Sequence, residues 1–159
     1  MEIKIKINAD GLNDTLNTLA DACQNREPLM RNLSEQLLDC VHENFAQQGR
    51  PAWKPTSRGG MILQDTRRLL NSITPSFDNS TARAGTNLVY AAIHNNGGKT
   101  RPHVIKPKRA KALKFNGRYA KSVNHPGSDI PARTFLSVTD EDIVGFVETT
   151  NDYIASHKK

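Results

Sequence analysis

The sequence predicts an α+β protein in which helices pack against a mainly antiparallel sheet, with a protruding basic β-hairpin. Three observations lead to this class. Apolar residues recur at helical spacing towards both ends of the chain, short alternating segments lie between them, and the dipeptide Asn116-Gly117 separates two of these segments. At 159 residues, the chain is most simply a single domain, residues 1–159, with the basic hairpin region at about 99–124.

The N-terminal quarter predicts one strand and two helices. Residues 2–7 alternate charged residues with isoleucine, which is typical of a strand with one apolar face. Asp10 suits the N-cap of a short helix, and Pro28 suits the first turn of a longer one. The longer helix carries a stripe that should face the core, formed by Met30, Leu33, Leu37, Val41 and Phe45.

The middle of the chain predicts short elements joined by loops. Glycine and proline end the second helix near residue 49 and place Trp53 on a loop, where it either anchors the loop on the core or contacts another subunit. A third short helix should direct Leu69, Leu70 and Ile73 inwards. Strands are expected at residues 73–77 and 81–86, followed by one helical turn at 90–94 that begins with Tyr90.

The C-terminal half predicts the hairpin and a last helix. Strands are expected at residues 103–105, 112–115 and 118–123, with the turn at Asn116-Gly117. A last strand is expected at residues 135–138. Thr139 and Asp142 have capping-box spacing at the start of the final helix. The apolar side chains of that helix are expected to be buried, namely Ile143, Phe146, Val147 and Ile154.

The positive charge is concentrated in one part of the chain. Between Asn79 and Ser128 there are ten basic residues and no acidic one, namely Arg83, Lys99, Arg101, Lys106, Lys108, Arg109, Lys111, Lys114, Arg118 and Lys121. Such a field steers an acidic partner to one surface, and both nucleic acid and acidic protein fit. Because only Phe115 and Tyr119 interleave with the charges, weak contact with DNA phosphates is favoured over base readout. The plainer reading is a solvated strand face whose lysines protect an exposed edge.

Motifs for catalysis and ligand binding are absent from the sequence. It contains no His-x-x-x-His or Cys-x-x-Cys pair, no Gly-x-Ser-x-Gly turn and no phosphate-binding glycine loop. We therefore expect no catalytic residue, no cofactor, no metal ion and no small-molecule substrate. Cys23 and Cys40 are expected to be reduced thiols, and no apolar run approaches the ~20 residues of a membrane span. A metal-free ribonuclease that uses His94, His103 or His125 would leave no motif and remains open.

Four segments, in this order, carry a family resemblance. They read GRPAWKP at 49–55, ILQDTRRLLNSI at 62–73, GTNLVYAAIHN at 85–95 and IPARTFL at 130–136, ahead of an acidic helix. Together they resemble the phage virion morphogenesis family, the tail-completion proteins of Mu-like and related contractile-tailed phages and prophages. Thr134 departs from the pattern, because proline is more usual after the arginine.

The resemblance implies a structural protein, not an enzyme. It would complete the tail terminus or neck so that head and tail join stably, acting as a ring of copies with phage tail or neck proteins as partners. It would be found in the bacterial cytoplasm during assembly and then in the virion. The alternative class is a small basic RNA-acting enzyme or a nucleic-acid-binding module.

A ring needs two different patches that meet head to tail, and the basic hairpin and the acidic helix start could supply them. Arg133, in the last matching segment, fits an internal brace better than a subunit contact. The candidate interface residues are Trp53, Tyr90, Lys106, Lys108, Arg109, Lys111, Lys114, Arg118, Arg133, Asp140, Glu141 and Asp142.

Overall fold

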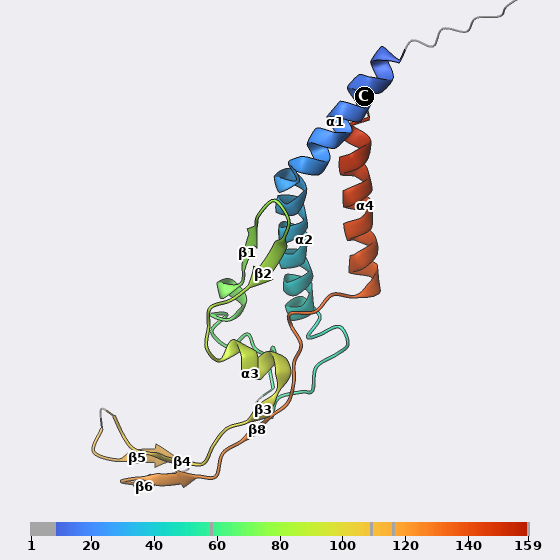
Figure 1. Cartoon of the computed structure of the whole chain (residues 1–159). Helices are drawn as coiled ribbons and strands as arrows, with labels where there is room; N and C mark the ends of the chain where they lie inside the picture. The colour runs from blue at the N-terminus through green and yellow to red at the C-terminus, as the bar shows by residue number, and fades with distance from the viewer. Residues whose placement is uncertain (1–8, 58, 109, 116, 159) are drawn as a thin grey trace, which may run out of the picture. The chain divides into compact units, whose positions relative to one another are not determined.

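The computed structural model describes residues 9–57, 59–108, 110–115 and 117–158 (Figure 1). The chain divides into two compact units: unit 1 comprises Met1–Leu88 and Phe135–Lys159, and unit 2 comprises Val89–Thr134. The mixed α+β class is confirmed, because the described residues form four α-helices and small antiparallel sheets. That both units behave as one domain stays a prediction. The strand expected at residues 2–7 lies outside the described residues.

Three helices build most of unit 1. They are α1 (Asp10–Gln24), α2 (Glu27–Ala46) and α4 (Asp140–Ser156). Pro28 lies in the first turn of α2, as predicted. Figure 1 shows α4 running alongside α2, and the hydroxyl of Tyr153 donates a 2.8 Å hydrogen bond to the carbonyl of Asn25, between α1 and α2.

A β-hairpin completes unit 1. Strands β1 (Thr74–Phe77) and β2 (Ala82–Gly85) pair antiparallel and pack on α2, close to the predicted bounds. The carboxylate of Asp78 accepts hydrogen bonds from the backbone N–H groups of Ser80 and Thr81, which fixes the turn. The third short helix is a 3₁₀ turn, η1 (Leu70–Ser72).

The core of unit 1 is centred on aromatic rings at the end of α2. Phe45 is 1% exposed and Phe135 is fully buried, with their ring centroids 5.4 Å apart. Val41, Leu69 and Ile73 are also buried there. The predicted stripe of α2 is therefore correct at Val41 and Phe45, whereas its N-terminal members are only half-buried.

The strand predicted at residues 135–138 is wrong, since this segment bends at Leu136 and has no strand pairing. The cause is Asn44, a fully buried residue of α2. Its side-chain amide donates to the carbonyl oxygens of Phe135 at 3.0 Å and Ser137 at 2.8 Å. A side chain thus binds the backbone groups that a neighbouring strand would otherwise have used.

The expected burial of the α4 side chains is also wrong. Ile143, Val147 and Ile154 are 47%, 54% and 39% exposed, and Phe146 is half-buried. No residue of α4 is fully buried. The helix packs on α2 through one narrow side, so most of its apolar stripe faces solvent.

Unit 2 is a short helix followed by a long two-stranded antiparallel ribbon. The helix is α3 (Ala91–Asn96), where one helical turn was predicted. Outgoing strands are β3 (Gly98–Lys99), β4 (His103–Ile105) and β5 (Leu113–Phe115). Returning strands are β6 (Arg118–Ala120), β7 (Val123–His125) and β8 (Asp129–Ile130). We call residues 98–130 the basic arm.

The two sides of the basic arm differ in length. Pairs β3–β8 and β4–β7 share one register, in which Gly98 faces Ile130 and Ile105 faces Val123. Beyond them, seven residues (106–112) precede β5 on the outgoing side, but only two (121–122) separate β6 from β7. The outgoing side therefore has five extra residues before β5 pairs with β6. Asn116 of the predicted turn lies outside the described residues.

Candidate protein interface

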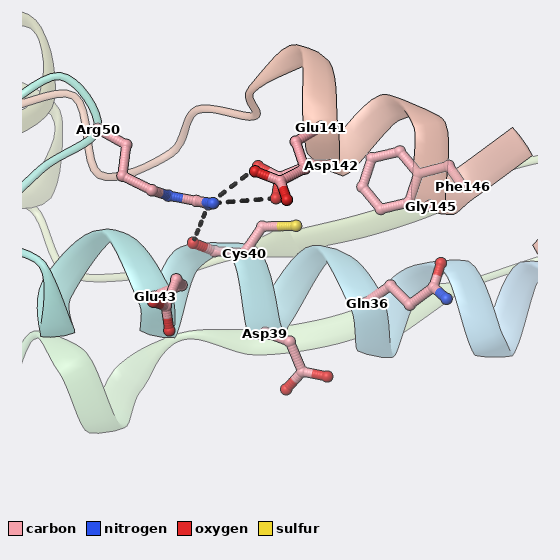
Figure 2. Close-up of a pocket in the computed structure, with 9 residues that line it drawn as sticks. All are labelled: Gln36, Asp39, Cys40, Glu43, Arg50, Glu141, Asp142, Gly145 and Phe146. Carbon is pink, nitrogen blue, oxygen red and sulfur yellow. Dashed lines mark hydrogen bonds and ion pairs between the residues drawn. The ribbon is translucent and has the colours of Figure 1, made fainter.

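Arg50 links the loop after α2 to the start of α4. Its guanidinium donates to both carboxylate oxygens of Asp142, at 3.0 Å and 2.9 Å. It also donates to the carbonyl of Cys40 at 3.1 Å (Figure 2). A further hydrogen bond of 2.8 Å runs from the guanidinium to the side-chain oxygen of Asn44. The Arg50 and Asp142 side chains are only 16% and 12% exposed. This forked geometry is specific to arginine.

Asp142 also closes the capping box that the sequence predicts. Its carboxylate accepts a hydrogen bond from the backbone N–H of Thr139, whose hydroxyl accepts one from the backbone N–H of Asp142. Burial tends to raise the pKa of Asp142, but these hydrogen bonds and Arg50 outweigh it, so the pKa lies below its ordinary value. Of the three predicted interface acids on α4, Asp142 is occupied by internal partners, while Asp140 and Glu141 are exposed.

A hollow of about 370 Å³ opens beside this ion pair, between α2 and α4. Three exposed acids line it, Asp39 and Glu43 from α2 and Glu141 from α4 (Figure 2). We call this hollow the acidic groove. Cys40 also lines it, and burial together with the nearby Asp142 charge raises the pKa of its thiol. The thiol therefore stays protonated and unreactive near neutral pH.

Trp53 belongs to the core of unit 1. It is 7% exposed, and its ring meets Phe45 edge-on at a centroid distance of 5.6 Å. Gly49 has a φ of +103° and packs against the indole, where any Cβ atom would collide with the ring. Of the two roles that the sequence left open, this placement favours the loop anchor.

The predicted basic residues lie along the arm of unit 2. Lys106, Lys108, Lys111, Lys114 and Arg118 are all exposed, and the ammonium of Lys114 lies 5.7 Å from the centre of the Tyr119 ring. Arg109 lies outside the described residues. By sequence, unit 2 carries ten Lys and Arg residues and one Asp, a formal charge of +9. Unit 1 carries twelve Lys and Arg against fifteen Asp and Glu, a formal charge of −3.

Tyr90 and Arg133 both lie beside His94 in unit 2. Tyr90 is 37% exposed, and its ring meets the His94 ring edge-on at 6.0 Å. Arg133 is 7% exposed, and its backbone N–H donates to the carbonyl of His94 at 2.9 Å. Burial first, and then the charge of Arg133, lower the pKa of His94, so its imidazole is neutral near pH 7. This burial suits the internal brace expected for Arg133.

Residues 7–155 match the model of the phage virion morphogenesis family. The chain belongs to this family. It is also 38% identical to Mu-like prophage FluMu G protein 2 of Haemophilus influenzae over 154 residues, which covers 96% of this chain and 95% of that protein. No solved structure matches the chain. The resemblance carried by the four segments is thus confirmed.

Membership of the phage virion morphogenesis family gives the protein a role in building the virion, and this implies contacts with other virion proteins. No helix in the described part of the chain is long and apolar enough to cross a membrane. Within that same part, no three His, Cys, Asp or Glu side chains cluster in a way that could hold a metal ion.

Asp39 and Glu43 were not selected as interface candidates from the sequence. They stand one helical turn apart on α2, a spacing that would have marked them as one acidic surface. Glu141 was already a candidate from the sequence, but only the packing of α4 on α2 brings it to the same groove as Asp39 and Glu43.

Proposed function

We propose that the protein completes the tail terminus or neck of the virion and supports stable head–tail joining. In this proposal it acts as a ring of copies held by protein–protein contacts, and it catalyses no reaction. The observation that carries the proposal is the division of charge within one chain. Unit 2 carries +9 on an extended arm, and unit 1 carries −3 with three exposed acids around one groove.

The contact between neighbouring copies joins two different patches. The outgoing segment 106–112 of the basic arm presents Lys106, Lys108 and Lys111, and the acidic groove presents Asp39, Glu43 and Glu141. A contact between unlike patches is heterologous, so it generates a ring when the rotation closes. Each exposed ion pair contributes only about 0.2–1 kcal/mol and is screened by salt. We therefore expect weak pairwise association that tail or neck partners reinforce during assembly.

Charge reversal on both patches tests the contact. Lys106→Glu, Lys108→Glu and Lys111→Glu together should reduce the self-association of the purified protein, measured as mass by light scattering across concentration. Asp39→Lys, Glu43→Lys and Glu141→Lys together should do the same. Mixing the two variants should restore association, because the reversed arm then meets the reversed groove.

Arg67→Glu with Arg68→Glu is the control for charge alone, since both side chains are exposed in unit 1 and lie outside the groove. This variant should associate like the wild type. The contact is disproved if the arm and groove variants keep wild-type mass at low salt, or if their mixture does not recover.

Head–tail joining is tested in the phage or prophage that carries the gene. Without the protein, lysates should contain heads and tails that are separate under the electron microscope, and supplying the wild-type chain should restore joined particles. Normal joined virions in its absence would refute the role. We also expect weak contact with DNA through the arm, with affinity that falls steeply as salt rises. Tight binding to RNA or DNA at physiological salt would instead support the alternative class, a nucleic-acid-binding module.

A further inference from the structure

A second hollow in unit 1 is apolar, and its lining residues differ from those of the acidic groove. Its volume is about 500 Å³, within the range of protein binding sites. Leu37 and Val41 of α2 line it together with β2 and residues 136–138. Leu136 and Val138 are 40% and 43% exposed there. We call this feature the β2 groove.

The edge of β2 that faces away from β1 has unpaired backbone groups. The N–H of Asp78 donates to the carbonyl of Thr81 at 2.9 Å, so the next hydrogen-bonded pair of this hairpin is Ser76 with Arg83. Ala82 and Ala84 alternate with these pairs and direct their N–H and C=O groups away from β1. Among the described residues, neither alanine has a backbone partner on that side. Both line the groove.

An unpaired strand edge beside an apolar hollow is a template for one more strand. An added strand would pair its backbone with Ala82 and Ala84, and every second side chain would enter the hollow. The chain itself contains a segment with this pattern. Residues 2–7, outside the described residues, read EIKIKI and place isoleucine at every second position.

We propose that residues 2–7 of a second copy add as a strand to β2, with Ile3, Ile5 and Ile7 covering the apolar groove. The side chains of Lys4 and Lys6 would then remain in solvent. Burial of three isoleucines against Leu37, Val41, Leu136 and Val138 supplies the affinity, and the β2 edge supplies the backbone hydrogen bonds.

The length of α1 indicates that the added strand comes from a second copy and not from the same chain. The 15 residues of α1 extend about 22 Å, and Figure 1 shows the helix running away from α2 instead of folding back on it. The groove lies at Leu37–Val41, about 15 Å further along α2. Only Asn8 and Ala9 join Ile7 to Asp10, which spans roughly 10 Å of extended chain. The isoleucines of one chain therefore do not reach its own groove.

This contact goes beyond the charged contact proposed above, and either one can fail without the other. The arm and the acidic groove interact through exposed charges, whereas the added strand is apolar. In about 1 M NaCl the Debye length is about 3 Å, so the charged contact is screened and the strand contact persists.

Disulfide trapping between two kinds of chain tests the strand contact. One chain carries Ile3→Cys, Ile5→Cys or Ile7→Cys, and a second chain of different mass carries Val138→Cys. Both also carry Cys23→Ser, because Cys23 is exposed. At about 1 M NaCl, at least one pair should give a mixed disulfide dimer on a non-reducing gel. Val144→Cys, at a 56% exposed position on α4 outside the groove, should give about tenfold less.

Equal yields with Val138→Cys and Val144→Cys would overturn the proposal. So would a chain carrying both cysteines that closes on itself without forming mixed dimers, because the segment would then occupy its own groove. If the cysteine variants form disulfides poorly, a second measurement tests the same contact. At about 1 M NaCl, Ile5→Ser should weaken self-association about tenfold, whereas Lys4→Ser should change it less than about twofold. No association at this salt, or equal effects of the two serines, would refute the added strand.

Discussion

At the scale of single residues, Arg50 links three parts of unit 1. It joins α2, the loop that holds Trp53, and the start of α4 through hydrogen bonds to Cys40, Asn44 and Asp142. Asn44 continues the network to the carbonyls of Phe135 and Ser137. Loss of any one member leaves the others buried with unpaired polar atoms, so substitutions here should be costly.

Arg50→Lys should lower the free energy of unfolding by about 2 kcal/mol, because a lysine cannot make the forked contact with Asp142 or reach Asn44 at the same time. Urea unfolding followed by circular dichroism measures this. Arg83→Lys is the matched control, since Arg83 is 63% exposed and its nitrogen lies 3.5 Å from Asp78. It should change stability by less than about 0.5 kcal/mol. Equal effects of the two lysines would contradict the clamp.

Asp142 predicts how stability depends on pH. Its pKa in the folded chain lies below the ordinary value of 3.8, so the ionised carboxylate stabilises the fold. This stabilisation is complete above about pH 4 and is lost as the pH falls through the folded pKa. Asp142→Asn should be less stable than the wild type at about pH 6, and the difference should shrink below about pH 4. Urea unfolding across this range measures it, and a constant difference would show that Asp142 does not titrate in this way.

At the scale of elements, the clearest question concerns which faces of the helices are buried. Val41→Ala in α2 should lower the free energy of unfolding by about 2 kcal/mol, because the side chain is only 4% exposed. Val147→Ala in α4 should cost less than about 0.5 kcal/mol, because that valine is 54% exposed. Thermal and urea unfolding compare the pair. A similar cost at both positions would mean that the stripe of α4 is buried as its spacing first suggested.

Local signals in the sequence predicted the elements better than their packing. Pro28, the capping box of Thr139 with Asp142, and the two strands around Asp78 all depend on neighbours within a few residues, and they are confirmed. The failures depend on distant residues. Residues 135–138 look like a strand, but Asn44, about ninety residues earlier, binds their carbonyls. The apolar spacing of α4 predicts a helix, yet it does not reveal how much of that face finds a partner within unit 1.

The same limit applies to the candidate site. The charges of the basic arm were visible in the sequence, but the five extra residues in the segment 106–112 follow only from the pairing registers. The sequence placed Asp142 both in the capping box and among the three candidate interface acids of α4. Its hydrogen bonds to Thr139 and Arg50 separate it from Asp140 and Glu141, which remain exposed.

At the scale of the whole molecule, a shortened arm separates a specific contact from a general effect of charge. The N–H of Thr100 donates to the carbonyl of Ser128, so hydrogen-bonded pairs continue at every second position and would next place Lys106 opposite Ser122. Replacing residues 107–121 with Asn-Gly gives a two-residue hairpin turn at that point. The change removes six Lys and Arg residues and no acid, so the formal charge falls from +6 to zero.

The shortened chain should keep its thermal midpoint within about 3 °C, because the described residues among those removed contribute no side chain to the core of unit 1. A general effect of charge predicts stronger self-association, since copies without net charge no longer repel one another. The arm-to-groove contact predicts the opposite: the salt-sensitive part of self-association disappears, while any strand contact through β2 persists at high salt. Light scattering at low and high salt distinguishes the two. Salt-sensitive association that survives the deletion would show that the basic arm is not the surface that meets the acidic groove.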